Sequence, residues 1–290
     1  MSEITAQMVK QLREMTGAGM MECKRALEET AGDIEAAVDV LRTRGLAAAA
    51  KKAGRATNEG LIVAAVSADG LAAAMAEVNC ETDFVSRNEV FQGYAAEVVA
   101  AVLNTNPVDA EALLAAPTSK ETVGEMITEA IHTIGENIQI SHFVRTTVDC
   151  GLIASYIHAG GRLGVLVTVK LGNQSDANDA EIKALAKDIA MQVAAANPGA
   201  VSRADFDSGF LEREMAIYIA QAAESGKPEE IQAKMAEGRM EKFFKDSALL
   251  EQAFIKDPDK TIKQVIDAVA KTIGTSIEVT GFQRFELGQN

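Results

Sequence analysis

The chain has 290 residues and carries 42 acidic against 28 basic side chains, for a formal net charge of -14. A chain this acidic repels phosphate backbones, so we expect no direct binding of nucleic acid. It has no uncharged run of 18 apolar residues and no signal peptide, so we expect a cytoplasmic protein without a membrane segment.

The cysteines give no sign of a metal or a disulfide. Cys23, Cys80 and Cys150 form an odd set without CxxC or Cys/His ligand spacing, so we expect free thiols in a reducing compartment and no structural zinc. Neither a Walker phosphate loop nor a GxGxxG fingerprint is present. We therefore expect no metal and no cofactor.

The first 54 residues predict a bundle of three short helices and a linker. Apolar stripes at helical spacing predict the three core faces as Met8, Leu12 and Met15, then Met20, Cys23 and Leu27, then Ile34, Val38 and Leu41. Thr5 is expected to cap the first helix, and Gly45 to end the third. The alanine-rich linker 46–56 reads as helical or extended.

Two adjacent methionines in this head cannot both face one core. Met20 is in phase with the buried stripe, so Met21 is available as an exposed, adaptable contact. The alternative, in which both pack inside around the preceding turn, carries equal weight.

The rest of the chain contains an internal duplication. "GLIVAA" begins at Gly60 and "GLIASY" at Gly151, and two helical segments ending at Pro107 and Pro198 have the same offset of 91 residues. A third element, "IGENIQISHFVR" from Ile134, matches "IGTSIEVTGFQR" 139 residues later. The second copy thus contains about 48 additional residues.

The additional residues predict a helical hairpin over 210–244. Leu211, Met215 and Tyr218 form one stripe, "SGKP" forms a turn, and Ile231 begins another stripe with Met235 and Gly238. A protruding hairpin serves contact between chains, unless it folds back on its own domain.

Alternating apolar strands joined by a short turn begin each copy and predict antiparallel sheets covered by helices. We therefore expect an α+β fold. Its predicted units are a head and linker (1–54), a first subdomain (55–150), a second subdomain (151–198 and 247–290) and an inserted coiled-coil hairpin (199–246).

The segment "EVNCETDFVSRNEV" places Phe84 between the second strand and a helix. If one helix runs on from Thr82, Phe84 joins the buried stripe of Phe91. If instead Ser86 and Glu89 form a capping box, the helix begins at Ser86 and Phe84 is left on an exposed turn. The second copy has "NQSD" at this place and manages without an aromatic residue.

Motifs along nearly the whole chain resemble one family. They are "EITAQMVKQLREMTGAGMMECKRAL", "AAAKKAGRA", "EVNCETDFV", "IGENI", "SYIHAGGRLGVLV" and "VTGFQRFELG". The chain resembles elongation factor Ts, the guanine-nucleotide exchange factor of elongation factor Tu. Relatives commonly continue past the last motif into a C-terminal helix that contacts the partner, whereas this sequence stops at Asn290, so we do not expect that contact here.

The resemblance implies site residues and partners. The segment that intrudes beside the magnesium site of the GTPase would be Thr82, Asp83, Phe84 and Val85. Contacts of the three-helix, ubiquitin-associated-like head would be Arg13, Met20 and Met21. Ile134, Gly135 and His158 would help hold a helix end near the intruding phenylalanine. The partner would be elongation factor Tu, GDP-bound or nucleotide-free, and the hairpin 199–246 would be a dimer contact.

Two other functions compete with nucleotide exchange. The head alone looks like the ubiquitin-associated module of an adaptor protein. A cysteine hydrolase would use Cys80 beside a helix N-terminus, with His158 as the base, although no orienting group or oxyanion motif accompanies them. As an exchange factor the chain would make and break no covalent bonds, so we expect no enzyme in that sense.

Overall fold

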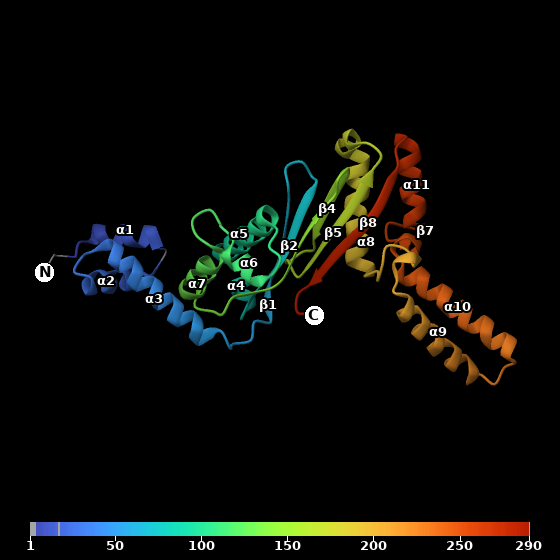
Figure 1. Ribbon diagram of the computed structural model, residues 1–290, viewed down its shortest axis with the longest axis horizontal. Helices are drawn as coiled ribbons and strands as arrows, with labels where there is room; N and C mark the ends of the chain where they lie inside the picture. Colours follow the sequence, from blue (N-terminus) through green and yellow to red (C-terminus); the bar gives the residue numbers. More distant parts are fainter. Residues whose placement is uncertain (1–3, 17, 290) are drawn as a thin grey trace.

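The fold was analysed in a computed structural model that describes residues 4–16 and 18–289. The molecule is elongated, with the head at one end, a helical hairpin at the other and two sheets between them (Figure 1). The expected α+β class is confirmed.

The head is a bundle of α1 (Ala6–Thr16), α2 (Met20–Glu29) and α3 (Ile34–Lys52). The Thr5 hydroxyl accepts a hydrogen bond from the Met8 amide, as expected of a helix cap. Leu12, Cys23 and Leu27 are fully buried in its core. The head packs through α3 on α7 (Val123–Ile134), which joins it to the first sheet.

Three predictions for the head are wrong: the end of the third helix at Gly45, and the burial of Met15 and of Met20, which is 59% exposed. Helix α3 passes through Gly45 and ends at Lys52, because Gly45 lies in the contact with Thr128 and His132 of α7 rather than at a free helix end. Met15 is 59% exposed, since the adjacent positions Val9 and Leu12 supply the buried face of α1.

The first copy of the duplication forms a three-stranded antiparallel sheet in the order β1-β2-β3. Its elements are β1 (Glu59–Val66), β2 (Ala72–Cys80), α4 (Asp83–Ser86), α5 (Glu89–Thr105), α6 (Ala110–Ala115), α7 and β3 (Gln139–Thr147). Helix α5 covers one face of this sheet, where Phe91 is fully buried, and α7 packs on α5.

The second copy repeats the arrangement in the order β4-β5-β8. Its elements are β4 (Gly151–Ile157), β5 (Leu163–Leu171), the 3-10 turn η1 (Gln174–Asn178), α8 (Ala180–Ala196), α11 (Ile262–Ile273) and β8 (Ile277–Glu286). Between α8 and α11 lie η2 (Arg203–Asp205), α9 (Ser208–Ala223), α10 (Glu229–Ser247), η3 (Leu249–Glu251), β6 (Ala253–Phe254) and β7 (Asp257–Thr261).

The backbone confirms that the two copies are equivalent. Gly60 and Gly151 have φ of 151° and 143°, and a Cβ on either would lie within 2.3 Å of a carbonyl oxygen of the neighbouring strand. Asn106 and Asn197 end α5 and α8 in the left-handed conformation. The duplication found in the sequence therefore extends to unusual backbone conformations.

The two sheets also pack against each other. Ile62 and Met75 of the first sheet contact Ile153 and Leu166 of the second in a shared buried cluster. Strand β2 is consequently buried on both faces, although its sequence was expected to alternate between a covered and an open face.

The predicted hairpin is present as α9 and α10, which project from the second copy (Figure 1). The rings of Phe206, Phe210, Phe243 and Phe244 pack at its base. Arg203 lies over the Phe244 ring and pairs with Glu241 and Glu251. The stripe predicted at Ile231 is wrong: this side chain is 43% exposed, and Ala236 and Met240 are buried instead.

The capping box predicted from Ser86 and Glu89 is also wrong. Helix α5 begins at Glu89, and the Asn88 side chain caps it by accepting from the Val90 amide at 2.8 Å. Ser86 is the last residue of the preceding turn α4, where its hydroxyl donates to the Asp83 carbonyl. Asparagine is as good a cap as serine. Because the cap is Asn88 and not Ser86, α5 begins later and residues 83–86 form a separate turn.

Candidate functional site

The corner formed by residues 81–85 presents Phe84 to solvent. Strand β2 ends at Cys80, and the single turn α4 carries Phe84 with its side chain 81% exposed. The next residue, Val85, packs against the core of the first copy. The expectation of an exposed turn is confirmed, and the alternative that placed Phe84 in the buried stripe of α5 is wrong.

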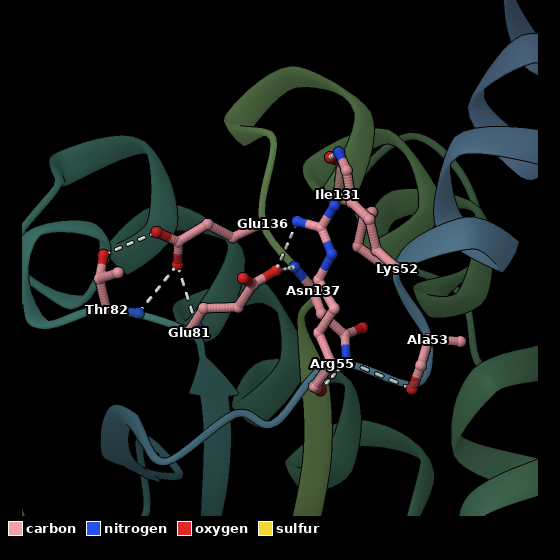
Figure 2. A network of polar contacts seen from close by, with 8 residues as sticks. All are labelled: Lys52, Ala53, Arg55, Glu81, Thr82, Ile131, Glu136 and Asn137. Carbon is pink, nitrogen blue, oxygen red and sulfur yellow. Dashed lines mark hydrogen bonds and ion pairs between the residues drawn. The ribbon is translucent and has the colours of Figure 1, made fainter.

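A carboxylate on the opposite chain segment holds the start of this turn. Glu136 accepts from the backbone amides of Glu81 and Thr82, both at 3.0 Å, and from the Thr82 hydroxyl at 2.6 Å (Figure 2). Thr82 stands at the N-cap position but makes no capping bond to its own turn. Three donors of the corner therefore converge on one side chain.

A second carboxylate makes the reciprocal contact. Glu81 accepts from the Asn137 amide at 2.7 Å and from the Arg55 guanidinium at 3.3 Å (Figure 2). These bonds, above all the Asn137 amide, lower the pKa of Glu81. The last backbone pair of the β2–β3 ladder is Asn79 with Gln139, and Glu81 and Asn137 face each other at the continuing register. Side-chain bonds thus extend the ladder beyond its end.

The end of the head helix joins the same network. Lys52 donates to the Ile131 carbonyl at 3.0 Å, and the Asn137 amide group donates to the carbonyl oxygens of Arg55 and Ala53 (Figure 2). The link between head and core is therefore anchored beside the 81–85 corner rather than free.

The structure places the remaining predicted site residues, Ile134, Gly135 and His158, on two different segments of the duplicated region. Ile134 ends α7, and Gly135 follows it in the left-handed conformation, φ 89°, directly before Glu136. His158 is exposed on the β4–β5 turn and bonds to the Tyr156 hydroxyl at 2.9 Å. That turn is attached to β1 through the Ile62 amide and the Gly161 carbonyl, and α4 packs on the same strand.

The predicted head residues converge on one groove of about 590 Å³. Arg13, Met20 and Met21 line it together with Ile4, Ala6, Val9, Lys10 and Lys24. Met20 and Met21 are 59% and 64% exposed, so the alternative that buried both is wrong, and Met20 also faces outward. An apolar groove rimmed by three basic side chains suits an apolar, acidic partner surface.

The surroundings of Cys80 argue against the function of a cysteine hydrolase. Cys80 is fully buried, its thiol donates to the Thr82 carbonyl at 3.2 Å, and burial raises its pKa to about 12. Such a thiol is not a nucleophile at neutral pH.

Within residues 4–16 and 18–289, no three His, Cys, Asp or Glu side chains gather as metal ligands, and no helix is long and apolar enough to cross a membrane.

Sequence reasoning missed Glu81, Glu136, Asn137 and Arg55 as contributors to this corner. An acidic residue after a helix-ending glycine has no periodic signal. The duplication offered a different signal. Thr275 occupies the position of Glu136 in the second copy, so the acidic residue is particular to the first copy.

The chain was also compared with known proteins. Residues 81–289 match the family described as Elongation factor TS, and residues 4–41 match the UBA/TS-N domain. Elongation factor Ts of Desulfovibrio desulfuricans is 50% identical, over 99% of both chains. The proteins of that name from Trichlorobacter lovleyi and Clostridium perfringens are 48% and 49% identical, over 99% of this chain and 93% of theirs.

Proposed function

Because the chain belongs to the elongation factor Ts family, we propose that it binds elongation factor Tu in its GDP-bound and nucleotide-free forms and accelerates the release of GDP. The observation that carries this function is 50% sequence identity with an elongation factor Ts over 99% of the chain. Accelerated release changes no covalent bond, so the protein acts as an exchange factor rather than as an enzyme. The proposed place of action is the cytoplasm, where translation takes place.

The proposed mechanism is displacement at the magnesium site. Tight nucleotide binding in such a GTPase rests on Mg²⁺ bridging the phosphates and on backbone amides around them. Residues 82–85 act as a wedge that enters the GTPase and disturbs both. Factor and nucleotide then lower each other's affinity by the same factor, which allows GTP to bind after GDP has left.

The exposure of Phe84 supports the wedge. An aromatic ring that is 81% exposed contributes little to the stability of the free protein but has much apolar surface to bury in a partner. Asp83, which pairs with Arg87 on the surface at 2.8 Å, is free to exchange that partner for a polar group near the metal.

The head supplies affinity in this proposal. The head lies at the far end of the molecule from the hairpin and apart from α4, which carries the wedge (Figure 1). Met21→Ala and Arg13→Ala should raise the half-saturating concentration of factor roughly five- to tenfold, as for interface anchors. The release rate at saturation should stay within about twofold of the wild type, and an equal loss in both quantities would contradict this division of roles.

We propose the hairpin 199–246 as a dimer contact. Ile217, Ile219 and Ile231 are exposed on α9 and α10, which supports burial against a second copy. Replacing residues 213–239 by a short Gly/Ser link leaves the phenylalanine base intact. The variant should unfold cooperatively and elute as a monomer in light-scattering chromatography, at concentrations where the intact chain is a dimer. An intact chain that is monomeric at high concentration would contradict the dimer.

The function is tested by release of a fluorescent GDP analogue from purified elongation factor Tu. Substoichiometric chain should accelerate release with turnover, and heat-denatured chain is the control. A head-only fragment, residues 1–54, tests the adaptor alternative, which its UBA/TS-N match favours. Full binding by that fragment, with no acceleration by the whole chain, would replace exchange by an adaptor role.

A further inference from the structure

We propose that Glu136 is a positioning residue, which fixes the direction of Phe84 for nucleotide release without itself contacting the GTPase. The inference rests on the function proposed above and adds a residue outside the wedge and the partner contacts. It follows from how the 81–85 corner is attached to the rest of the molecule.

The corner has few attachments other than Glu136. Val85 is held by packing in the core, and Phe84 and the Asp83–Arg87 pair face solvent. The start of the turn is held by the three bonds from Glu81 and Thr82 to the Glu136 carboxylate and by the bond from the Cys80 thiol to the Thr82 carbonyl. Phe84 lies between these two fixed points, so its direction is set by the carboxylate at one end and by Val85 at the other.

Glu136 is itself well placed to act as an anchor. It follows Gly135, whose left-handed conformation ends α7, and its neighbour Asn137 is bound by Glu81 and by the backbone of Arg55. The two carboxylates, Glu81 and Glu136, thus cross between the segments in opposite directions (Figure 2). Such a reciprocal arrangement resists sliding of one segment along the other.

The second copy provides an internal comparison. Thr275 stands at the place of Glu136, and there the strands continue through a backbone bond from the Gly172 amide to the Ser276 carbonyl at 3.0 Å. The fold therefore closes this corner without a counterpart of Glu136, and the Asp176 carboxylate there accepts from the side chains of Asn173 and Ser175. The acidic anchor occurs in the copy that presents an exposed aromatic ring, which indicates a role in presenting it.

Three variants separate position from charge. Glu136→Gln removes the charge but keeps an oxygen that can accept from both amides, and Thr82 can reverse its hydroxyl bond. Glu136→Asp keeps the charge but withdraws it by one methylene, and Glu136→Ala removes both. The matched control is Gln174→Ala in the second copy, which loses two bonds to the Gly151 backbone, of 2.6 and 3.0 Å.

The experiment measures analogue release from elongation factor Tu at saturating factor, with thermal unfolding of each free variant. Glu136→Ala and Glu136→Asp should slow release about tenfold to a hundredfold, as expected when a reacting group is misplaced by about 1 Å. Glu136→Gln should stay within about twofold of the wild type. Gln174→Ala should lose thermal stability and keep the wild-type rate.

Other outcomes would overturn the proposal. Normal release with Glu136→Asp and Glu136→Ala would show that the anchor is dispensable. Loss in Glu136→Gln with retention in Glu136→Asp would indicate a direct charge contact with the GTPase. Equal slowing by Gln174→Ala would reduce the effect to general destabilisation. If the wild type itself failed to accelerate release, the proposed exchange function would fail first, which the wild-type curve shows separately.

Discussion

The two copies of the duplicated core are most informative where they differ, at the corner that follows the second strand. In the first copy this corner is open: Phe84 points to solvent and Glu136 holds the turn from outside. In the second copy it is closed, because the Gln174 side chain bonds both the amide and the carbonyl of Gly151. An exposed serine, Ser175, stands in the place of Phe84.

The scaffold beneath the two corners is the same. Each copy begins with a glycine that lies against the neighbouring strand, ends its long helix with a left-handed asparagine, and starts its last helix with a capping box. The difference therefore lies in a few side chains and not in the fold. The proposed wedge thus stands on one of two equivalent scaffolds, as is common for sites within a fold.

The largest expected effect concerns the shared core. Phe91 and Ile182 occupy the same position of α5 and α8, and both are fully buried. Phe91→Ala should lower the free energy of unfolding by about 3–5 kcal/mol and Ile182→Ala by about 2–5 kcal/mol, because each leaves a cavity. Urea denaturation measures both. A loss in the free energy of unfolding near zero at either position would contradict the structural equivalence of the two copies.

The strand glycines should give a smaller, matched effect. A Cβ at Gly60 or Gly151 would lie 2.3 or 2.0 Å from a backbone carbonyl oxygen, and both residues have positive φ. Gly60→Ala and Gly151→Ala should each cost at least about 2 kcal/mol of stability through strain. Gly70→Ala, at a turn with nothing within 4 Å, is a control for the positive φ alone. Unequal costs at the two matched glycines would show that the copies differ below the corner as well.

The smallest effect is a pH dependence that comes from Glu81 at the first corner. The Asn137 amide and then Arg55 lower the pKa of Glu81 in the folded protein. Its contribution to stability is therefore present above the unfolded value of about 4.3 and is lost as the pH falls through the lower folded pKa. In urea midpoints between pH 3 and 7, Glu81→Gln should flatten this acid limb. Glu237→Gln on exposed α10 should not. An unchanged acid limb in Glu81→Gln would contradict the assignment.

The sequence predicted the regular parts of this fold well. Helical stripes, the 91-residue offset and the inserted hairpin are periodic or repeated, so they identify the head, the two copies and α9–α10. The exposure of Phe84 was one of two open alternatives, and the absence of an aromatic residue from the second copy favoured the correct one.

The errors share a physical cause. Gly45 was expected to end a helix, and Met15 and Ile231 to be buried, but their surroundings are set by other elements or by a neighbouring side chain. The bonds between Glu81, Glu136 and the Arg55 segment join residues that are more than twenty positions apart. No local pattern encodes such bonds, and so the contacts of Glu136 with the 81–85 corner appeared only in three dimensions.

The central claim is that Phe84 is an exposed wedge and not a core residue. The most direct measurement compares Phe84→Ala with the wild type in two properties, the free energy of unfolding of the free chain and the release of a fluorescent GDP analogue from elongation factor Tu at saturating factor. We predict a stability change within about 0.5 kcal/mol, as for surface substitutions, and a large slowing of release. A loss of about 3–5 kcal/mol, or an unchanged release rate, would contradict the account.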